Sequence, residues 1–230
     1  MLEEKNKVIW ENIFSTREWG KYPSLHVVRV IAKNFYDVED RTKIKILEVG
    51  AGAGANIWYL AREGFSISAI EFSKSAIKKI QERFKQENLT DRIEMLLEGD
   101  YYEKLDSFRN NYFDCIIDVE SIICNSYERS KSIINKIYNK LKKGGIFISL
   151  HFGKNSWGDY SKNRELIEVY EGPISKTGFV RFLDEKDIND LYSNNKMKYE
   201  FIHLDEYFYD INDKIKCLRE YIVCLRKLID

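Results

Sequence analysis

Stretches with strand-like and helix-like patterns alternate along this chain from residue 43 onward, and this alternation limits the possible folds more than any other feature. Runs rich in apolar and β-branched residues predict five strands, at 43–50, 66–71, 92–100, 112–120 and 146–152. Between them, apolar residues recur at helical spacing, as at Ala76, Ile80 and Phe84. Strands that alternate with helices pair in parallel, so we predict an α/β fold with a Rossmann-like, doubly wound sheet.

The last third of the chain has a different pattern. Residues 198–210 and 215–228 resemble two long strands joined by a short turn, with no helix pattern between them. They predict a C-terminal antiparallel hairpin that closes a mostly parallel sheet. The chain has only two prolines and no Ser/Gly/Pro-rich linker, so residues 1–230 are expected to form a single domain. The helix pattern at 133–141 is expected to end in a left-handed glycine cap at 142–145.

Charge and cysteine usage narrow the class of protein. The 37 basic and 37 acidic residues balance to a formal net charge of zero, which disfavours nucleic acid as the main partner. The longest apolar runs are too short for a membrane span, and residues 1–14 lack the apolar core of a signal peptide. The four cysteines form no CxxC pair, and no cluster has metal-ligand spacing. We therefore expect a cytoplasmic protein without a metal site.

The stretch "KILEVGAGAGAN" at 45–56 is the first candidate binding element. Gly50, Gly52 and Gly54 follow the first strand, where the absence of side chains lets a ligand approach the backbone. Glu48 lies within that strand, and Glu71 ends the second strand, where a carboxylate can accept hydrogen bonds from ribose hydroxyls. Taken alone, the glycines also fit a tight turn without any ligand.

A second acidic position follows the third strand. Gly99 and Asp100 lie at the same predicted sheet edge, and the Asp100 carboxylate can accept a hydrogen bond from an adenine amino group. A plain turn residue is the alternative interpretation of Asp100.

The ordered set "LEVGAGAGAN", "IEFS", "GDYY", "FDCIIDVES" and "LKKGGIFI" resembles the class I S-adenosylmethionine-dependent methyltransferases over residues 43–152. The resemblance implies S-adenosyl-L-methionine as cofactor and S-adenosyl-L-homocysteine as its product. It places the methionine part and ribose of the cofactor against four residues: Glu48, Gly50, Gly52 and Gly54.

The same resemblance assigns the rest of the cofactor site. Glu71 and Phe72 would hold the ribose and adenine, with Gly99, Asp100 and Tyr101 beside them. The segment that contains Asp118 and Glu120 would lie near the transferred methyl group. Residues 1–42 would form an N-terminal helical arm, 43–152 the cofactor-binding core, and 153–230 the substrate-facing segment with the hairpin.

A nicotinamide or flavin dinucleotide is the main alternative, since residues 50–55 also satisfy G-x-G-x-x-A. The Glu48 carboxylate would repel a pyrophosphate but suits the amino group of the sulfonium cofactor. The Lys-Lys-Gly-Gly turn and the terminal hairpin are similar to those of methyltransferases, and together these features favour S-adenosylmethionine.

Aromatic residues before the first strand are candidates for a cover over the cofactor. Trp19 and Tyr22 could lie beside the sulfonium, with Lys21 or Tyr22 near the cofactor carboxylate. An aromatic anchor for the N-terminal arm is equally compatible with the sequence. Trp10 and Phe14 share one face of a helix, which we expect to pack on the sheet.

His151, at the carboxyl end of the fifth strand, is expected to face the crevice as a general base, and Glu120 is the second catalytic candidate. A hydrogen-bonded structural histidine is the alternative for His151. Trp157, Tyr160 and Arg181 could shape the acceptor site, although Arg181 could also pair with Glu185. His26 and His203 receive no role.

The function expected from the resemblance is direct in-line methyl transfer to a small molecule, such as a sugar, a sugar nucleotide or a phosphorylated metabolite. RNA methylation and a non-catalytic cofactor-binding partner are the alternatives. The neutral charge balance and the absence of an Asn-Pro-Pro-Tyr element after the fourth strand weigh against RNA. The sequence gives no indication of the oligomeric state.

Overall fold

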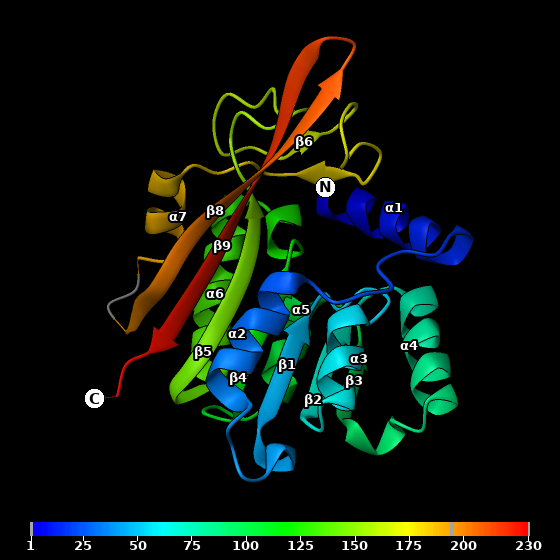
Figure 1. Cartoon of the computed structure of the whole chain (residues 1–230), viewed down its shortest axis with the longest axis vertical. Coiled ribbons are helices and arrows are strands. Elements are labelled where there is room, and N and C mark those ends of the chain that lie inside the picture. The colour runs from blue at the N-terminus through cyan, green and yellow to red at the C-terminus, as the bar shows by residue number, and fades with distance from the viewer. Residues whose placement is uncertain (1, 194–195, 230) are drawn as a thin grey trace.

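A seven-stranded sheet forms the centre of the protein, for which a computed structural model describes residues 2–193 and 196–229 (Figure 1). The strands lie in the order β3-β2-β1-β4-β5-β9-β8. Their bounds are β1 Lys45–Val49, β2 Ser66–Glu71, β3 Ile93–Glu98, β4 Phe113–Val119, β5 Leu141–Phe152, β8 Met197–Ile211 and β9 Lys214–Lys227. The first five pair in parallel, whereas β9 is antiparallel to both β5 and β8. This arrangement confirms the predicted fold class.

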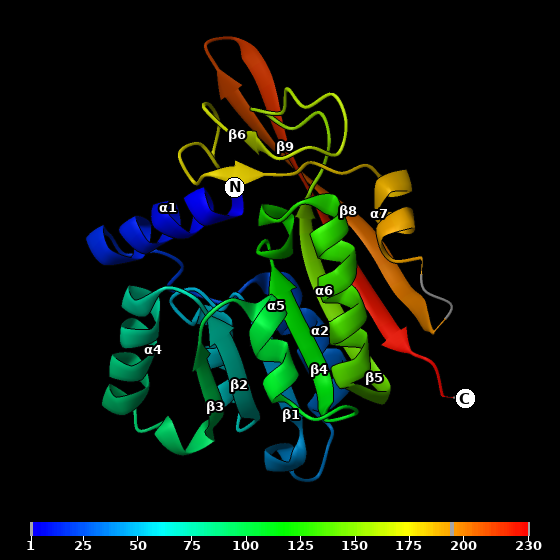
Figure 2. The ribbon, with the colours of Figure 1, turned by 180° about the vertical axis from the view of Figure 1, so that it is seen from behind.

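Helices cover both faces of the sheet, as Figures 1 and 2 show from opposite sides. They are α1 Leu2–Thr16, α2 Leu25–Phe35, α3 Ala55–Arg62, α4 Lys74–Gln86, α5 Tyr101–Lys104, α6 Tyr127–Lys140 and α7 Glu185–Leu191. Short 3-10 turns occur at Arg41–Lys43, Thr90–Arg92, Leu105–Ser107 and Ile122–Cys124. None of the helices in the described ranges is long and apolar enough to cross a lipid bilayer.

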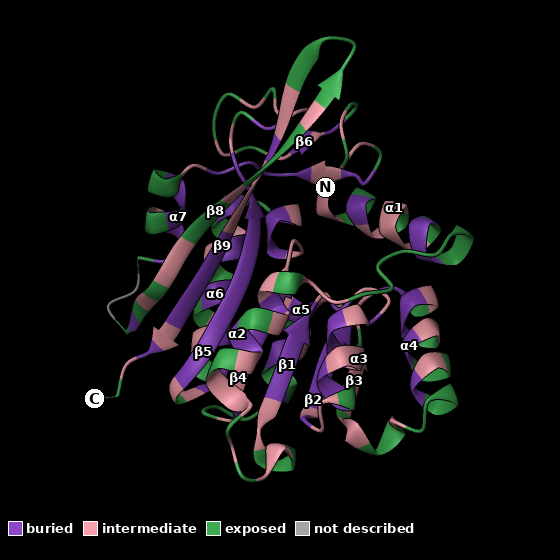
Figure 3. Cartoon of the chain, viewed as in Figure 1, coloured by how far each residue is buried: buried purple, intermediate pink, exposed green. Residues whose placement is uncertain are grey.

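Two apolar cores follow from the alternation of side chains along each strand. Ile46 of β1 packs with α2, α3 and α4 on one face, and its neighbour Leu47 packs with α5, α6 and α7 on the other. Both side chains are fully buried, and Figure 3 shows β1 and β5 buried over most of their length. A strand buried on both faces needs a nearly continuous apolar run, which is the pattern the sequence carries.

The predicted glycine cap at 142–145 is wrong. Helix α6 ends at Lys140, and Leu141 already has extended dihedral angles (φ −69°, ψ 139°) as the first residue of β5. Gly144 has a left-handed φ of 77°, and the pairing of β4 with β5 shifts register between Phe113 and Cys115. The glycines therefore form an irregularity inside a longer strand, which begins five residues before the predicted start.

The predicted C-terminal hairpin is confirmed. Asn212 and Asp213 form a two-residue turn between β8 and β9, and both have left-handed φ angles, 51° and 62°. This is the geometry that matches the twist of antiparallel strands. The tip of the hairpin projects beyond the rest of the sheet (Figure 1).

A second layer lies over the carboxyl ends of the parallel strands. It contains α1 and the two-stranded sheet of β6 Ile167–Glu168 and β7 Phe179–Val180 (Figure 2). In a parallel sheet this edge, where the strand order reverses between β1 and β4, is where ligands bind. The cover therefore encloses the region in which a site is expected.

Candidate functional site

A cavity of about 350 Å³ lies between the carboxyl ends of β1 and β4 and the overlying helix α1. Its floor is the turn after β1 together with the segments that follow β2 and β4, and its roof includes Trp10 and Phe14 of α1. The volume falls in the range of about 300–1,000 Å³ that is usual for small-molecule and cofactor sites.

Two of the three glycines in the turn after β1 line the cavity, as predicted. Gly50 and Gly52 line the cavity and have left-handed φ angles of 67° and 52°. A Cβ on Gly50 would lie 2.4 Å from the Cβ of Ser121, and one on Gly52 would lie 3.1 Å from the ring of Phe14. A side chain at either position would therefore displace its neighbour and occupy the space next to the turn.

Gly54 and Gly99 have structural roles, and neither lines the cavity. Gly54 is the left-handed N-cap of α3, where a Cβ would lie 2.7 Å from Ile80. The N–H of Gly99 donates to the backbone oxygen of Glu71 over 2.9 Å, so Gly99 helps to hold the end of β2. The direct cofactor contacts predicted for these two glycines are corrected accordingly.

Glu48 places a buried carboxyl group beside the glycine turn. Asn56 donates to its Oε1 over 2.6 Å, while its Oε2 accepts no hydrogen bond of ordinary geometry. Burial raises the pKa of Glu48 to about 8; the bond from Asn56 opposes this rise, whereas the charges of Asp118 and Glu71 add to it. Within residues 2–193 and 196–229, Glu48 is thus an acid that lacks a cationic partner, as a site for a ligand's amino group requires.

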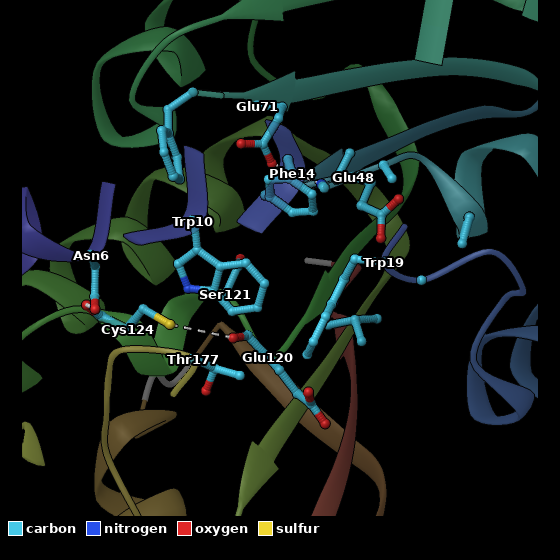
Figure 4. A pocket seen from close by; sticks show the side chains of 18 of the residues that line it. Asn6, Trp10, Phe14, Trp19, Glu48, Glu71, Glu120, Ser121, Cys124 and Thr177 are labelled. Atoms are coloured by element: carbon cyan, nitrogen blue, oxygen red, sulfur yellow. Dashed lines mark hydrogen bonds between the residues drawn. The ribbon is translucent and has the colours of Figure 1, made fainter. Parts of the chain in front are cut away.

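Glu71 lies at the same end of the cavity (Figure 4), and Phe72 lines the wall beside it. Its Oε2 accepts from the N–H of Gly52 over 2.7 Å, and its Oε1 accepts from the N–H of Ser73 over 2.8 Å. Burial raises the pKa of Glu71 to about 7, although these bonds oppose the rise. The carboxylate has further acceptor capacity for hydroxyl groups, so the ribose role of Glu71 stays a prediction.

Asp100 and Tyr101 also line the cavity. Burial opposes ionisation of Asp100, but Lys7 at 3.1 Å and Arg129 at 2.8 Å lower its pKa below the usual range. Tyr101 donates to the backbone oxygen of Ser121 over 3.0 Å. Asp100 therefore stays ionised while it ties the cavity wall to α1 and α6.

Aromatic side chains form the roof and one wall of the cavity (Figure 4). The ring of Trp10 lies 5.4 Å from that of Phe14 and 5.3 Å from that of Trp19, measured between centroids. Trp19 and Tyr22 line the cavity, as the sequence suggested. The expectation that Trp10 and Phe14 pack on the sheet is wrong, because both side chains line the cavity.

Helix α1 is anchored by polar side chains that the sequence analysis did not identify. The amide of Asn6 exchanges two hydrogen bonds with the backbone of Phe179 in β7, of 2.7 and 2.8 Å. The Glu11 carboxylate accepts from the hydroxyl groups of Ser73 and Ser75 at the start of α4, over 2.5 and 2.6 Å. In the sequence, the one indication of a role for Asn6 and Glu11 is that they belong to the helix that carries Trp10 and Phe14.

Asp118 is fully buried and does not line the cavity, so its predicted contact with the cofactor is corrected. Its Oδ1 accepts from the hydroxyl of Ser121 over 2.6 Å and from the N–H of Ile122 over 3.0 Å. Its Oδ2 accepts from Ser149 over 2.6 Å. Asp118 thus fixes the turn that positions Glu120 and Ser121.

The expectation that His151 faces the crevice as a general base is wrong. Its side chain is fully buried outside the cavity, 3.0 Å from the hydroxyl of Ser149 and 2.6 Å from that of Tyr192. Burial and the charge of Arg181 lower the pKa of His151 to about 3. The structural interpretation of this histidine therefore holds.

The residues expected to shape the acceptor site also lie outside the cavity. Arg181 is fully buried, and its guanidinium donates to the backbone oxygen of Asn125 over 2.5 Å and to Ser130 over 2.9 Å, so it does not form the alternative surface pair with Glu185. Trp157 packs against Tyr209, and Tyr160 stacks on Tyr170 at the surface.

Glu120 does line the cavity, and it brings a second carboxyl group with it. It directly follows β4, and its side chain is hydrogen-bonded to that of Glu220 on β9. His26 and His203, to which the sequence assigned no role, flank Asp205 in the same region at 2.9 and 2.7 Å.

The charged lining of the cavity is mostly acidic. Among the described residues, five carboxyl groups and one lysine line it: Glu3, Glu48, Glu71, Asp100, Glu120 and Lys7. An acidic, aromatic cavity suits a ligand with a sulfonium and an ammonium group and would repel a pyrophosphate. The Glu48 oxygen without a hydrogen bond and the space that Gly50 and Gly52 leave beside the turn are features that fit S-adenosylmethionine.

Comparisons with known proteins agree with this geometry. Residues 46–145 match the family described as "Methyltransferase domain". The chain is 28% identical to demethylmenaquinone methyltransferase of Leptospira interrogans over 152 residues, which cover 64% of this chain and 56% of that protein. It is 25% identical to phosphoethanolamine N-methyltransferase of Plasmodium falciparum over 211 residues, which cover 86% and 74% of the two chains.

A solved structure shows the same fold over nearly the whole chain. The CcbJ methyltransferase of Streptomyces caelestis superimposes with a TM-score of 0.69 at 12% identity and covers 99% of both chains. The chain spans little more than half the length of the first of the curated relatives that it matches, 56%. On the family match, the fold and the fit of the cavity, residues 46–145 form the cofactor-binding domain of a class I S-adenosylmethionine-dependent methyltransferase, a family that uses S-adenosylmethionine as methyl donor.

Proposed function

We propose that this chain transfers the methyl group of S-adenosylmethionine to a small-molecule acceptor by direct in-line displacement. The observation that carries the proposal is the buried Glu48 carboxyl group, which lies beside the Gly50–Gly52 turn and has no cationic partner in the described part of the chain. In this proposal Glu48 accepts from the cofactor amino group, Glu71 from the ribose, and Phe72 packs on the adenine.

The remaining cofactor contacts are proposed from other residues of the same cavity. Asp100, Tyr101, Trp19 and Tyr22 line it together with Glu71 and Phe72. The cofactor supplies an electrophilic methyl group, so the protein's main task is to align donor and acceptor. Alignment of this kind lowers reaction barriers by about 7–11 kcal/mol.

The proposed acceptor is a small molecule such as a sugar, a sugar nucleotide or a phosphorylated metabolite. The names of the Leptospira and Plasmodium relatives, which refer to demethylmenaquinone and phosphoethanolamine, support a small acceptor. Lys7, the one lysine in the described lining, already pairs with Glu4 and Asp100. A phosphate would therefore have to stay outside the cavity, which favours acceptors whose methylated end is uncharged or cationic.

A calorimetric titration with S-adenosylhomocysteine, with NAD and NADP in parallel, tests the cofactor assignment. We expect saturable one-site binding of S-adenosylhomocysteine alone, since the acidic lining repels pyrophosphate. Binding of a dinucleotide in its place would contradict the proposal. Transfer of labelled methyl groups to a panel of sugars, sugar nucleotides and amines then tests catalysis, and cofactor binding without transfer to any acceptor would indicate a non-catalytic partner.

A further inference from the structure

Two carboxyl groups meet at the wall of the cavity where β4 ends. Glu120 is partly exposed to the cavity, and Glu220 lies on β9, opposite Phe152 of β5 and Asp205 of β8. The side chains of Glu120 and Glu220 are hydrogen-bonded to each other. Because ionised carboxylates only accept, such a bond requires a proton on one of the two groups.

The groups around the pair do not neutralise it. Asp118 adds a further negative charge, and Tyr207 of β8 is hydrogen-bonded to Glu220. His26 of α2 is the basic group that faces Glu220, and it is already paired with Asp205 at 2.9 Å. Within 2–193 and 196–229, no lysine or arginine forms an ion pair with either glutamate.

Burial, and then the neighbouring carboxyl group, raise the pKa of Glu120 well above its usual range. Burial likewise raises the pKa of Glu220. The pair therefore holds a proton under conditions in which exposed glutamates hold none. A cation that enters the cavity would supply the charge that the protein does not provide.

The backbone holds Glu120 in this position at a cost. Its φ angle of 58° lies in the left-handed region, which costs a side-chain-bearing residue roughly 1–2 kcal/mol. The conformation is fixed on both sides, because Asp118 binds the backbone of Ser121 and Ile122, and Cys124 contacts the backbone oxygen of Glu120. Strain that the surroundings enforce in this way is typical of functional positions.

We propose that the Glu120–Glu220 pair binds the ammonium group of an amine acceptor and takes the proton that its nitrogen must lose before methylation. This inference rests on the proposed function and specifies its acceptor class. Glu120 contacts the acceptor, and Glu220 shares the proton and passes it toward solvent along the half-buried side of β9.

Protons and charge balance over the reaction. Binding of the ammonium displaces the proton of the pair to water, so that two carboxylates lie beside the cation. One N–H proton of the bound ammonium then moves to Glu120, which restores the singly protonated pair and leaves a neutral amine with a free electron pair. As the new nitrogen–carbon bond forms, the carbon–sulfur bond of the methyl donor breaks and its electron pair stays on sulfur. The product ammonium carries the positive charge lost by the sulfonium, and the pair holds one proton, as it did before the amine bound.

An amine fits this pair better than an alcohol does. An alkylammonium loses its proton with a pKa of about 10, the ordinary value for lysine, and a pair with a raised proton affinity can accept that proton. General-base catalysis of this kind contributes about 10²–10⁴-fold to a rate. An alcohol is a far weaker acid and brings no positive charge to offset the acidic wall.

The test is a calorimetric titration of the full chain saturated with S-adenosylhomocysteine. The probes are three amines and their neutral isosteres: ethanolamine and ethylene glycol, n-butylamine and n-butanol, benzylamine and benzyl alcohol. Wild type is compared with Glu120→Gln, Glu220→Gln and, as matched control, Glu206→Gln, whose carboxylate pairs with Arg219 on the outside of the hairpin. Repeating each titration in buffers of different ionisation enthalpy measures the protons released or taken up.

We expect at least one amine to bind wild type at least about tenfold more tightly than its alcohol, with a change in bound protons. Glu120→Gln and Glu220→Gln should each remove this preference, while their affinity for S-adenosylhomocysteine and their melting temperatures stay close to those of Glu206→Gln. Equal binding of amine and alcohol, binding of none of the probes, or an unchanged amine preference in Glu220→Gln would overturn the inference and leave the proposed function intact. Failure of wild type to bind S-adenosylhomocysteine would overturn both.

Discussion

At the scale of single residues, Glu48 illustrates how a binding site keeps a buried acid in its neutral form. Its carboxyl group is buried with one oxygen left without a hydrogen bond, next to the turn where the backbone is most open to a ligand. An ionised carboxylate in that position is costly, so the group keeps its proton until a cation arrives.

The first prediction concerns the pH dependence of stability. The pKa of Glu48 is about 8 in the folded chain and near its ordinary value of 4.5 when unfolded, so the folded state binds more protons between these limits. Stability from this group is fully present below about pH 4.5 and is lost as pH rises through about 8. Glu48→Gln should flatten this fall in the ligand-free protein, as measured by chemical denaturation between these limits. A variant with the same slope as wild type would contradict the burial of an acid at this position.

A second prediction separates the roles of Glu71 and His151. Glu71→Ala should weaken S-adenosylhomocysteine binding by at least about tenfold, because it removes the carboxylate that holds Gly52 and faces the cavity. His151→Ala should instead lower the free energy of unfolding by roughly 2–4 kcal/mol, because it empties a fully buried site, with little effect on affinity. Calorimetry and denaturation of both variants test this division; comparable losses of affinity would refute it.

Residue positions that depend on local geometry were predictable, and those that depend on distant packing were not. The placement of Glu48, Gly50 and Gly52 at the cavity follows from a strand, a tight turn and a helix that are adjacent in sequence. The burial of His151 depends on Tyr192, which follows 41 positions later and covers it. No local pattern in the sequence reports such a contact.

At the scale of elements, α1 turns an open sheet edge into an enclosed cavity. It contributes Trp10 and Phe14 to the lining and is held at both ends, by Asn6 on β7 and by Glu11 on α4. Ile13 of the same helix is buried outside the cavity, so apolar packing adds to these polar bonds, while Trp10 and Phe14 face the ligand space.

The third prediction follows from this attachment. Glu11→Ala removes the hydrogen bonds from Ser73 and Ser75, which should weaken the attachment of α1 to α4 by about 1–2 kcal/mol. The fraction of molecules in which α1 is detached from the cavity should then rise about 5–30-fold. The dissociation rate of S-adenosylhomocysteine, followed by stopped-flow displacement, should increase to a similar extent. Glu4→Ala is the control, because Glu4 lies on the same helix and its ion pair among the described residues is with Lys7 at the surface. Equal rates in the two variants would show that α1 does not limit release.

Most helices and strands could be predicted because apolar residues recur in them at the regular spacing of each element. The predictions that were wrong have a physical cause. The Lys-Lys-Gly-Gly segment at 142–145 has the composition of a helix end, yet pairing with β4 extends β5 through it as an irregular strand. Similarly, Trp10 and Phe14 have the spacing of core residues, and only the position of α1 above the sheet edge shows that they face a ligand space. In both cases tertiary contacts override a correct local signal.

At the scale of the whole molecule, ligand binding should be visible as global stabilisation. A ligand that binds only the folded state stabilises it by about 2.7 kcal/mol at a concentration 100 times its dissociation constant. For a chain of this size that corresponds to a rise in melting temperature of about 5–11 °C. We predict this rise for S-adenosylhomocysteine in a thermal-shift assay, and none for NAD. A rise with NAD alone would reverse the cofactor assignment.

The order of the strands has a consequence for how the protein is made. β9 is synthesised after every other strand of the sheet, yet its place is in the interior, between β5 and β8. While the chain emerges from the ribosome, β5 has an unpaired edge and an apolar length that later becomes buried. The apolar edge of β5 therefore stays unpaired in the nascent protein until β9 has been made, and formation of the C-terminal hairpin is the step that protects this edge from aggregation.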